Sequence, residues 1–289
     1  MRETQSLYEW DADVSQLAQM REALRRRPQY ASAVQRLAGN LLRDADEDPS
    51  LGGLVRDAGR TVAALSAMSL DASGGVTLPR LKVMIAGFGL VSPGRARLLL
   101  RYMQHLGYLE PDPRCPTARP MLYRVTQRFR TSYMRHQASV LDAVSILEPA
   151  AGRVRDGLAT PGVMAALVAA QAEAFIAGSR QTTPFDLWYR VFMHRLAGIQ
   201  ILHGLVAQAE TFPPRGKIPF SAAETARRFK VSRVHVARMM REAEHQDFLV
   251  LEPGAVRFTE AGREALDWLY ASRLCVHLAC AARALKALS

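Results

Sequence analysis

The sequence predicts a mainly α-helical protein with two small β-hairpins, organised as two copies of one domain in a single chain. Three observations lead to this prediction. Apolar residues recur at helical spacing, the chain matches itself at an offset of 140 residues, and two short β-prone runs close each matching segment. The chain has 289 residues and is 49% hydrophobic, which fits two globular units and excludes a disordered or fibrous protein.

The internal repeat relates residues 79–109 to residues 219–249, with seven identical positions. The identical pairs are Pro79 and Pro219, Ala86 and Ala226, Val91 and Val231, Ser92 and Ser232, Arg101 and Arg241, His105 and His245, and Leu109 and Leu249. A period this long indicates two copies of a domain and not a solenoid. We therefore expect a first copy at residues 1–148 and a second copy at 149–289, with a junction near residues 149–157.

Both copies show the same order of predicted elements. A β-prone segment precedes a short helix, which in the second copy opens with the capping box Ser221-Ala-Ala-Glu224. A tight turn, a second helix and a β-hairpin follow. This order predicts a winged helix-turn-helix at residues 76–126 and again at residues 217–260.

The second helix of each predicted unit has a capped start and one apolar face. Ser92 and Ser232 are placed as N-caps, and Pro93 occupies the favoured first position in copy one. The apolar positions, which we expect to be buried, are Ala96, Leu99, Leu100 and Met103 in copy one and Val236, Met239, Met240 and Ala243 in copy two. The opposite faces are free to meet a ligand.

Further helices flank both predicted units. Helical spacing places them at residues 13–26, 29–45, 51–69 and 126–147 around the first unit, and at 161–178, 185–209 and 260–287 around the second. We expect these helices to pack one copy against the other, so that a single chain forms a pseudo-dimer.

The positive charge is concentrated in the two repeated segments. The chain carries a formal net charge of +11. Residues 77–135 hold eleven basic and two acidic residues, and residues 217–263 hold nine basic and six acidic residues, so these segments account for all of the excess. Such local clustering is typical of a surface that binds an anionic partner, and double-stranded DNA is the partner that we expect.

The outward positions of the second helices carry the side chains that DNA recognition requires. Arginine binds guanine in a bidentate manner or contacts phosphate, and the N-terminal part of such a helix enters the major groove. The candidate DNA-binding residues are Ser92, Pro93, Gly94, Arg95, Arg97 and Arg101 in copy one and Ser232, Arg233, His235, Arg238 and Arg241 in copy two. Because the two helices differ in sequence, we expect their DNA half-sites to differ.

One stretch of copy one resembles a known family. The run Ser92–Leu109, SPGRARLLLRYMQHLGYL, followed by Asp112-Pro-Arg114 and Tyr123-Arg-Val-Thr126, is similar to the recognition helix and wing of MarR-type transcription regulators. The resemblance implies DNA binding by a homodimer that is joined through its N- and C-terminal helices. It also implies that Arg114 enters the minor groove and that Asp112 holds it.

The two predicted wings differ. Arg119 lies in the same wing as Arg114 and is a further candidate for DNA contact. The resemblance of copy two to the family is weaker, although Arg238 stands where the family often has arginine. Its wing, 252–255, is seven residues shorter and lacks the Asp-x-Arg motif.

Other chemistries find little support in the sequence. Paired carboxylates, a nucleophile elbow and a zinc motif are missing, so we expect no enzyme, no cofactor and no metal site. Cys275 and Cys280 lie about 140° apart on a helix, which favours buried thiols over metal ligands. We expect Trp188, Tyr189 and Phe192 to lie in a core or an interface, near where a small effector of unknown identity would bind in relatives of this kind.

The sequence thus predicts a sequence-specific DNA-binding transcription regulator, active as a single-chain pseudo-dimer or as a homodimer. Two alternatives remain open: a plasmid- or phage-type replication initiator with two winged helices, and a structural adaptor whose winged helices bind protein. Three cysteines indicate a reducing compartment, and neither a secretory signal nor a membrane-spanning segment is evident. We therefore expect a cytoplasmic, nucleoid-associated protein without a membrane partner.

Overall fold

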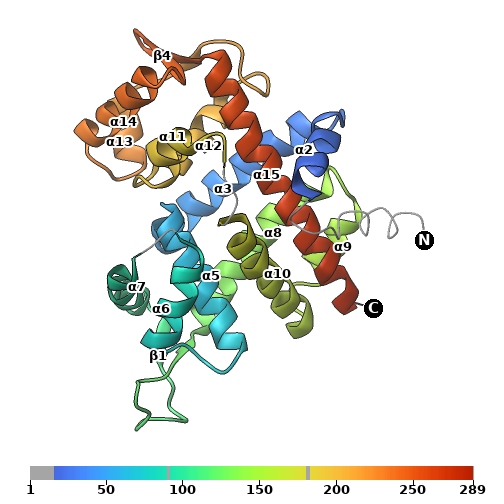
Figure 1. Cartoon of the computed structure of the whole chain (residues 1–289), viewed down its shortest axis with the longest axis vertical. Helices are drawn as coiled ribbons and strands as arrows, with labels where there is room; N and C mark the ends of the chain where they lie inside the picture. Colours follow the sequence, from blue (N-terminus) through green and yellow to red (C-terminus); the bar gives the residue numbers. More distant parts are fainter. Residues whose placement is uncertain (1–15, 90–91, 180–182, 289) are drawn as a thin grey trace.

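The computed structural model of the chain describes residues 16–89, 92–179 and 183–288 (Figure 1). The fold is mainly helical, with two small antiparallel sheets. The first half contains α2 (Leu17–Arg25), α3 (Tyr30–Glu47), α4 (Pro49–Leu54), α5 (Ala58–Ala72), α6 (Leu78–Gly87), α7 (Pro93–His105), β1 (Leu109–Pro111), β2 (Tyr123–Val125) and α8 (Gln127–Ser145). The second half contains α9 (Ala150–Asp156), α10 (Pro161–Ser179), α11 (Asp186–Trp188), a π-helical turn (Tyr189–Met193), α12 (Gly198–Gln208), β3 (Ile218–Pro219), α13 (Ala222–Arg228), α14 (Arg233–His245), β4 (Leu249–Glu252), β5 (Ala255–Phe258), α15 (Glu260–Leu285) and a 3-10 turn (Lys286–Leu288).

The first unit, residues 58–125, consists of α5, α6, α7 and the hairpin β1–β2. Thr77 caps α6 by accepting a hydrogen bond from the backbone N–H of Arg80 at 3.3 Å. Val76 forms an isolated antiparallel bridge with Tyr123, which joins the start of α6 to the hairpin. The predicted apolar face of α7 is buried in the core of this unit, which confirms its helical register.

The second unit, residues 198–258, repeats this order with α12, β3, α13, α14, β4 and β5. Its three strands pair in the order β3-β5-β4, all antiparallel. Ser221 caps α13 by accepting from the backbone N–H of Glu224 at 3.3 Å, as the capping box predicts. The predicted apolar face of α14 is buried.

The helices α7 and α14 are equivalent from end to end at the offset of 140. After each helix the chain passes through a left-handed residue, Gly107 with φ 69° and Asp247 with φ 56°. The next residue then donates its backbone N–H back to the helix, Tyr108 to Met103 and Phe248 to Ala243, both at 2.9 Å. The same backbone geometry therefore leads into both hairpins.

The structure corrects the predicted register before these helices. The C-cap residue of α6 is the buried Phe88 and that of α13 is the buried Phe229, so the offset there is 141. Ala86 is exposed whereas Ala226 is buried, so these two alanines are not equivalent. The Pro79–Pro219 match fails as well, because Pro79 lies in α6 and Pro219 in β3. The matched residue Val91 lies outside the described residues.

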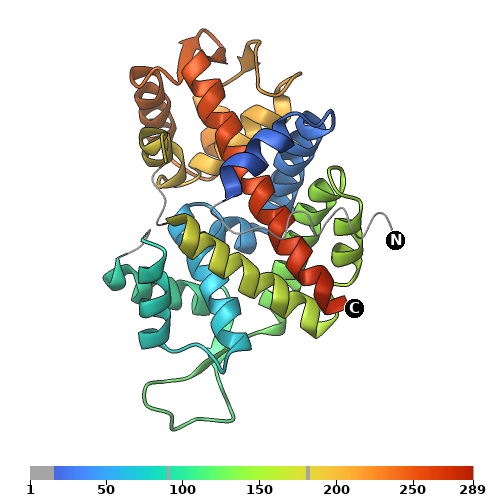
Figure 2. The ribbon, with the colours of Figure 1, turned by 45° about the vertical axis from the view of Figure 1, so that its right-hand side comes forward.

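The two halves exchange helices (Figure 2). Helix α3 packs on α8 of its own half and on α12, the first helix of the second unit. Helix α10 makes the reciprocal arrangement, because it packs on α15 of its own half and on α5, the first helix of the first unit. Val168 and Ala172 of α10 belong to the core of the first unit. Each half therefore completes the core of the other.

Three predicted segments differ from the structure. The expected junction at 149–157 is the helix α9, whose Ala150, Ala151 and Val154 are buried. The predicted helix 51–69 is interrupted before α5, and the predicted helix 185–209 is interrupted at Ala197, which has φ 62°. Both interruptions fall at equivalent positions, since Asp57 and Ala197 are the N-cap residues of α5 and α12.

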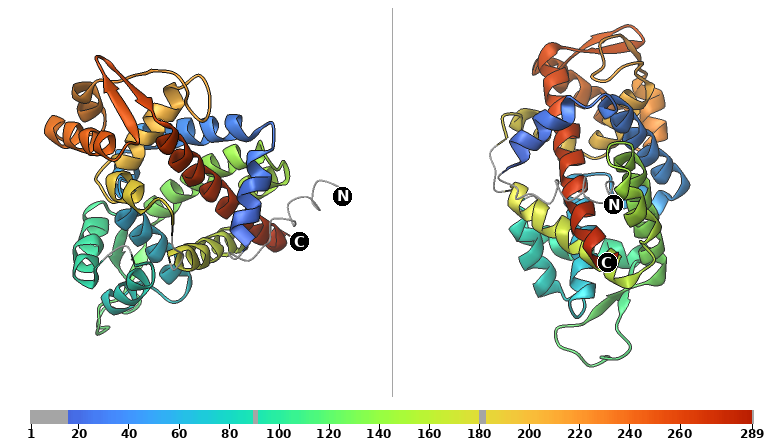
Figure 3. Two further views of the ribbon diagram at one scale, coloured as in Figure 1. Left: turned by 45° about the horizontal axis from the view of Figure 1, so that its top comes forward. Right: turned by 90° about the vertical axis from the view of Figure 1, so that its right-hand side faces the viewer.

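Helix α15 runs along the side of the molecule where α2 and α9 also lie (Figure 3). It packs on α2, α8, α9 and α10, and most of its residues are buried. The described ranges contain no helix that combines the length and the apolar character needed to cross a membrane.

Candidate nucleic-acid interface

Helices α7 and α14 lie on the same side of the molecule, away from the helices α2 and α9 and from the C-terminal end of α15 (Figure 1). The hairpin loop of the first unit extends at one end of the molecule, and the hairpin of the second unit lies at the other end. The apolar stripe of each helix faces its own core, so the opposite stripe faces solvent. Most of the candidate DNA-binding residues therefore lie on this side of the molecule.

On α7 the exposed candidates are Gly94, Arg95, Arg97 and Arg101. The helix begins at Pro93, as predicted. No ion pair is found for Arg97 or Arg101 within the described parts of the chain, so both guanidinium groups extend into solvent. These two arginines are four residues apart and so lie on one face of the helix.

Arg95 has a structural partner within the fold, in addition to its predicted contact with DNA. Its guanidinium lies 3.3 Å from both carboxylate oxygens of Asp57. Asp57 is buried and also accepts the backbone N–H of Arg60 at 2.9 Å as the N-cap of α5. The side chain of Arg95 thus fixes α7 to the start of α5, although 43% of it remains exposed.

Ser92 occupies the N-cap position of α7 but its side chain does not cap the helix, contrary to the prediction. The amide of Arg95, which a capping hydroxyl would bind, donates instead to the carbonyl oxygen of Ser92 at 3.0 Å. Ser232 does cap α14, because its hydroxyl accepts from the backbone N–H of His235 at 3.1 Å. The Ser92 hydroxyl is exposed at the helix start.

On α14 the exposed candidates are Arg233, Arg238 and Arg241. Arg241 contacts the carbonyl oxygen of Ala237 at 3.3 Å within its own helix. His235 is half-buried, and its Nε2 lies 2.9 Å from the carbonyl oxygen of Leu196 just before α12. His235 therefore plays the part in the second unit that Arg95 plays in the first, and it is a positioning residue.

The first hairpin loop holds an arginine on a buried carboxylate. Arg114 contacts Asp112 through its Nε at 3.0 and 3.2 Å, its Nη2 at 2.7 Å and its backbone N–H at 3.0 Å. Asp112 is 2% exposed and the Arg114 side chain is 78% exposed. These hydrogen bonds lower the pKa of Asp112 to about 2. Arg119 is exposed in the same loop, where it contacts the carbonyl oxygen of Ala118 at 3.0 Å.

The second hairpin is short, and its charges are paired internally. Glu252 contacts Lys217 at 2.5 Å and Arg257 at 3.5 Å. The hydrogen bond from Lys217 is the main reason why the pKa of Glu252 is lowered. The chain reverses at Pro253-Gly254, with Gly254 at φ 72°. This hairpin has no counterpart of Arg114.

Part of the basic surplus of the segment 77–135 pairs with carboxylates within the fold. Arg95, Arg130 and Arg135 pair with Asp57, Asp71 and Asp48, three carboxylates outside the segment 77–135. Arg124 pairs with Glu110 inside it at 2.7 Å. The charge available to a ligand is therefore smaller than the sequence indicates, and Arg97, Arg101 and Arg119 supply the part of it that lies on α7 and in the hairpin loop.

Two exposed aliphatic side chains lie among these arginines. Leu98 on α7 is 64% exposed and Val234 on α14 is 71% exposed. Leu98 directly precedes the apolar pair Leu99 and Leu100, so hydrophobicity alone does not distinguish it from the buried stripe. The spacing of the buried stripe identifies Leu98 as an outward position.

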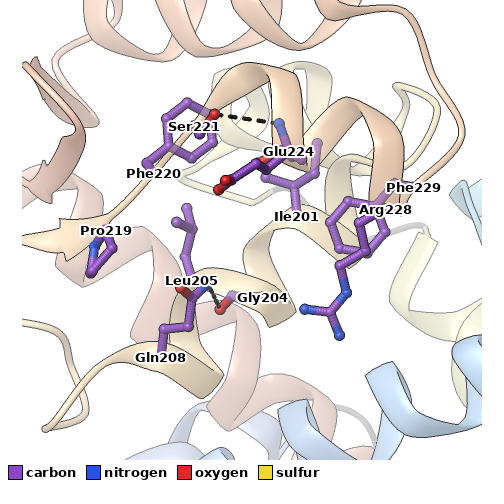
Figure 4. Close-up of a pocket in the computed structure, with 11 residues that line it drawn as sticks. Ile201, Gly204, Leu205, Gln208, Pro219, Phe220, Ser221, Glu224, Arg228 and Phe229 are labelled. Atoms are coloured by element: carbon purple, nitrogen blue, oxygen red, sulfur yellow. Dashed lines mark hydrogen bonds between the residues drawn. The ribbon is translucent and has the colours of Figure 1, made fainter.

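The aromatic residues that the sequence singled out lie near the second unit. Trp188 and Phe192 are fully buried in the core, and Tyr189 is half-buried beside Trp268. A separate hollow of about 250 Å³ lies between α12, α13 and β3, where Gln208, Glu224 and Arg228 surround an apolar floor of Ile201, Leu205 and Phe229 (Figure 4).

The thiols of α15 are buried, as expected. Burial raises the pKa values of Cys275 and Cys280 to about 12, so both are protonated at neutral pH. Within the described ranges no group of His, Cys, Asp and Glu side chains has the arrangement of a metal site.

Comparison of the chain with protein-family models, with curated proteins and with solved structures gives no match.

Proposed function

We propose that the chain is a sequence-specific transcription regulator that binds double-stranded DNA through two winged helix-turn-helix units. One observation carries the proposal. Helices α7 and α14 have equal length, bury the same face, expose arginines on the other, and lie on one side of the molecule. An arginine-bearing helix of this kind fits the major groove, where guanine offers two acceptors to one guanidinium.

The first hairpin supports the same proposal. The MarR-like motif implies a minor-groove role for Arg114, and this side chain is held by Asp112 while most of it is exposed. A guanidinium that is already oriented loses little conformational freedom on binding. The paired Glu252 and the short turn of the second hairpin favour a smaller contribution from that unit.

The exchange of α3 and α10 between the halves supports a single-chain pseudo-dimer. In the family that the sequence resembles, two chains supply two recognition helices to one DNA site. Here one chain carries both helices and the helices that join them. We therefore expect the protein to be a monomer in solution and to occupy both halves of a site.

The proposal is tested with the purified chain and labelled duplex DNA. Binding sites are first identified by genome-wide mapping of bound DNA, and affinity is then measured over a range of salt concentrations. We expect log K to fall linearly with log salt, with a slope near −0.9 for each phosphate contacted. Sites in promoters support the regulator, whereas arrays of repeats at a replication origin support the initiator. Failure to bind any duplex at moderate ionic strength would overturn the proposal.

A further inference from the structure

The outer faces of α7 and α14 differ in the order of their side chains. At the offset of 140, Gly94 is equivalent to Val234 and Leu98 is equivalent to Arg238. Arg97 is equivalent to Ala237, while Arg101 and Arg241 are the same residue type. An exposed aliphatic side chain therefore lies one helical turn further along α7 than along α14.

Leu98 and Val234 are unusual in their exposure. With Val83 they are the three most exposed large hydrophobic residues of the described chain, and two of these three lie on the helices that carry the candidate arginines. Neither residue is needed by the core, which is closed by the buried faces of the same helices. Arg101 follows Leu98 by three residues and Arg238 follows Val234 by four, so each aliphatic side chain has an exposed arginine beside it on the same helix face.

An aliphatic side chain in the major groove has one specific partner. The 5-methyl group of thymine is the apolar group exposed there, and contact with it distinguishes thymine from the other bases. Arginine beside it selects guanine. The combination of one aliphatic residue with arginines on the same helix face thus selects a short sequence that contains both thymine and guanine.

We propose that Leu98 and Val234 determine specificity by contacting thymine methyl groups, and that their different positions give the DNA site a direction. This inference rests on the proposed function. Four residues along a helix correspond to about 6 Å, whereas base pairs follow one another at about 3.4 Å. The two thymines therefore occupy different positions in their half-sites, and the preferred site is not a palindrome.

The first test uses the contacted methyl group itself. After the preferred duplex has been selected from a random library, each thymine of the α7 half-site is replaced in turn by deoxyuridine, which lacks only the methyl group. For one thymine we expect the wild-type affinity to fall about fourfold, the loss expected for one methyl contact. Leu98→Ala should weaken binding to the thymine duplex and should not respond to this replacement. Val234→Ala should show the same behaviour in the α14 half-site and retain the response in the α7 half-site.

The second test exchanges outward-facing residues between α7 and α14. The variant Gly94→Val/Arg97→Ala/Leu98→Arg gives α7 the residues that α14 has at three outward positions, 234, 237 and 238, and space around Gly94 is open for the larger side chain. Its fold is checked by circular dichroism and thermal unfolding. We expect this variant to prefer a palindrome of the α14 half-site, and the reverse variant Val234→Gly/Ala237→Arg/Arg238→Leu to prefer a palindrome of the α7 half-site.

The outcomes separate this inference from the proposed function. Two results would overturn this inference and leave DNA binding intact. In the first, the wild-type protein selects a palindromic duplex. In the second, the loss of affinity on replacing thymine by deoxyuridine is the same with and without Leu98 and Val234. If wild-type protein binds no duplex, the proposed function is overturned and this inference with it.

Discussion

The backbone N–H of Ala197 donates to the carbonyl oxygen of Arg56 at 2.9 Å. This bond joins the two halves where α5 and α12 begin. The guanidinium of Arg56 continues the contact, because it donates to the carbonyl oxygens of Phe229 and Lys230 in the turn before α14. The first half therefore holds the turn that positions the second candidate recognition helix.

Replacement of Arg56 by alanine should loosen that turn. Two carbonyl oxygens lose a charged donor, and hydrogen bonds to charged groups contribute about 1.5–3 kcal/mol. We expect Arg56→Ala to lower the free energy of unfolding in urea by about 1–3 kcal/mol and to speed amide exchange at residues 229–233. Arg26→Ala, at the exposed C-cap of α2, is the matched control and should change neither quantity. Equal stability of the two variants would contradict the assigned contact.

Asp57 should be important for the start of α5 and for the position of α7. Its carboxylate caps α5 and pairs with Arg95 and with the Arg60 side chain, and Asp57→Ala removes all three interactions. We expect a loss of about 1–2 kcal/mol in the free energy of unfolding, the usual cost of a lost N-cap. Asp57→Asn keeps a capping oxygen and should retain more of the stability. If alanine and asparagine are tolerated equally, the cap contributes nothing measurable.

The sequence predicted α7 and α14 well because the spacing of their apolar residues fits only one helical face. It also placed Ser221 and the hairpins correctly, since capping and strand signals are local. Arg95 and His235 were assigned to DNA contact because both lie at the start of an outward helix face. Their partners, Asp57 and Leu196, are 38 and 39 residues away, and nothing local in the sequence indicates them.

The interruptions of the predicted helices 51–69 and 185–209 could not be predicted from local sequence either. Ala197 adopts a left-handed conformation although alanine is a strong helix former, so its local preference is overridden by packing. The Cβ position at the neighbouring Gly198 lies 2.0 Å from the carbonyl oxygen of Phe192, a distance that only glycine permits. Gly198 is therefore required because its backbone lies close to that of Phe192. The helical periodicity of 185–209 gives no sign of this contact.

Arg97 and Arg101 should be the principal contacts of α7 with DNA. The double variant Arg97→Ala/Arg101→Ala should weaken binding to the preferred duplex by about 1–3 kcal/mol for each base-contacting arginine. The control Arg26→Ala/Arg43→Ala removes the same charge from the exposed C-cap of α2 and the exposed surface of α3. Fluorescence anisotropy at a fixed salt concentration measures both. Equal losses would remove the recognition role of α7 and leave only a general effect of charge.

Arg114 should contribute to affinity through A·T-rich DNA beside the α7 half-site. A narrow minor groove attracts arginine, so Arg114→Ala should cost about 1–3 kcal/mol on an A·T flank and less on a G·C flank. Because the pKa of Asp112 is about 2, the carboxylate that holds Arg114 stays charged above pH 4. The contribution of Arg114 should therefore be constant between pH 5.5 and 8. A contribution that is the same on both flanks would indicate a phosphate contact instead.

Stability should depend on pH through buried histidines between the two halves. His203 on α12 lies 2.5 Å from the hydroxyl of Tyr270 and 3.3 Å from the guanidinium of Arg273, both on α15. Burial, with smaller effects of Arg273 and of His136, lowers the pKa of His277 to about 3 and lowers that of His203 as well. His136 itself contacts Asp44 of α3 at 3.2 Å. This cluster therefore contains histidines that are neutral in the folded protein.

The direction of the pH effect follows from these pKa values. Unfolded histidine has a pKa near 6.5, so between about pH 3 and pH 6.5 the unfolded chain binds a proton that His277 does not bind, and the lowered pKa of His203 acts in the same direction. The free energy of unfolding should thus fall as the pH drops below about 6.5, by up to about 1.4 kcal/mol per pH unit for each histidine. In urea unfolding at pH 5 and pH 7.5, His277→Gln should lose about 2 kcal/mol less than wild type over this interval. His105→Gln, at an exposed position, should behave like wild type. An unchanged pH dependence in His277→Gln would show that this imidazole is protonated in the folded chain.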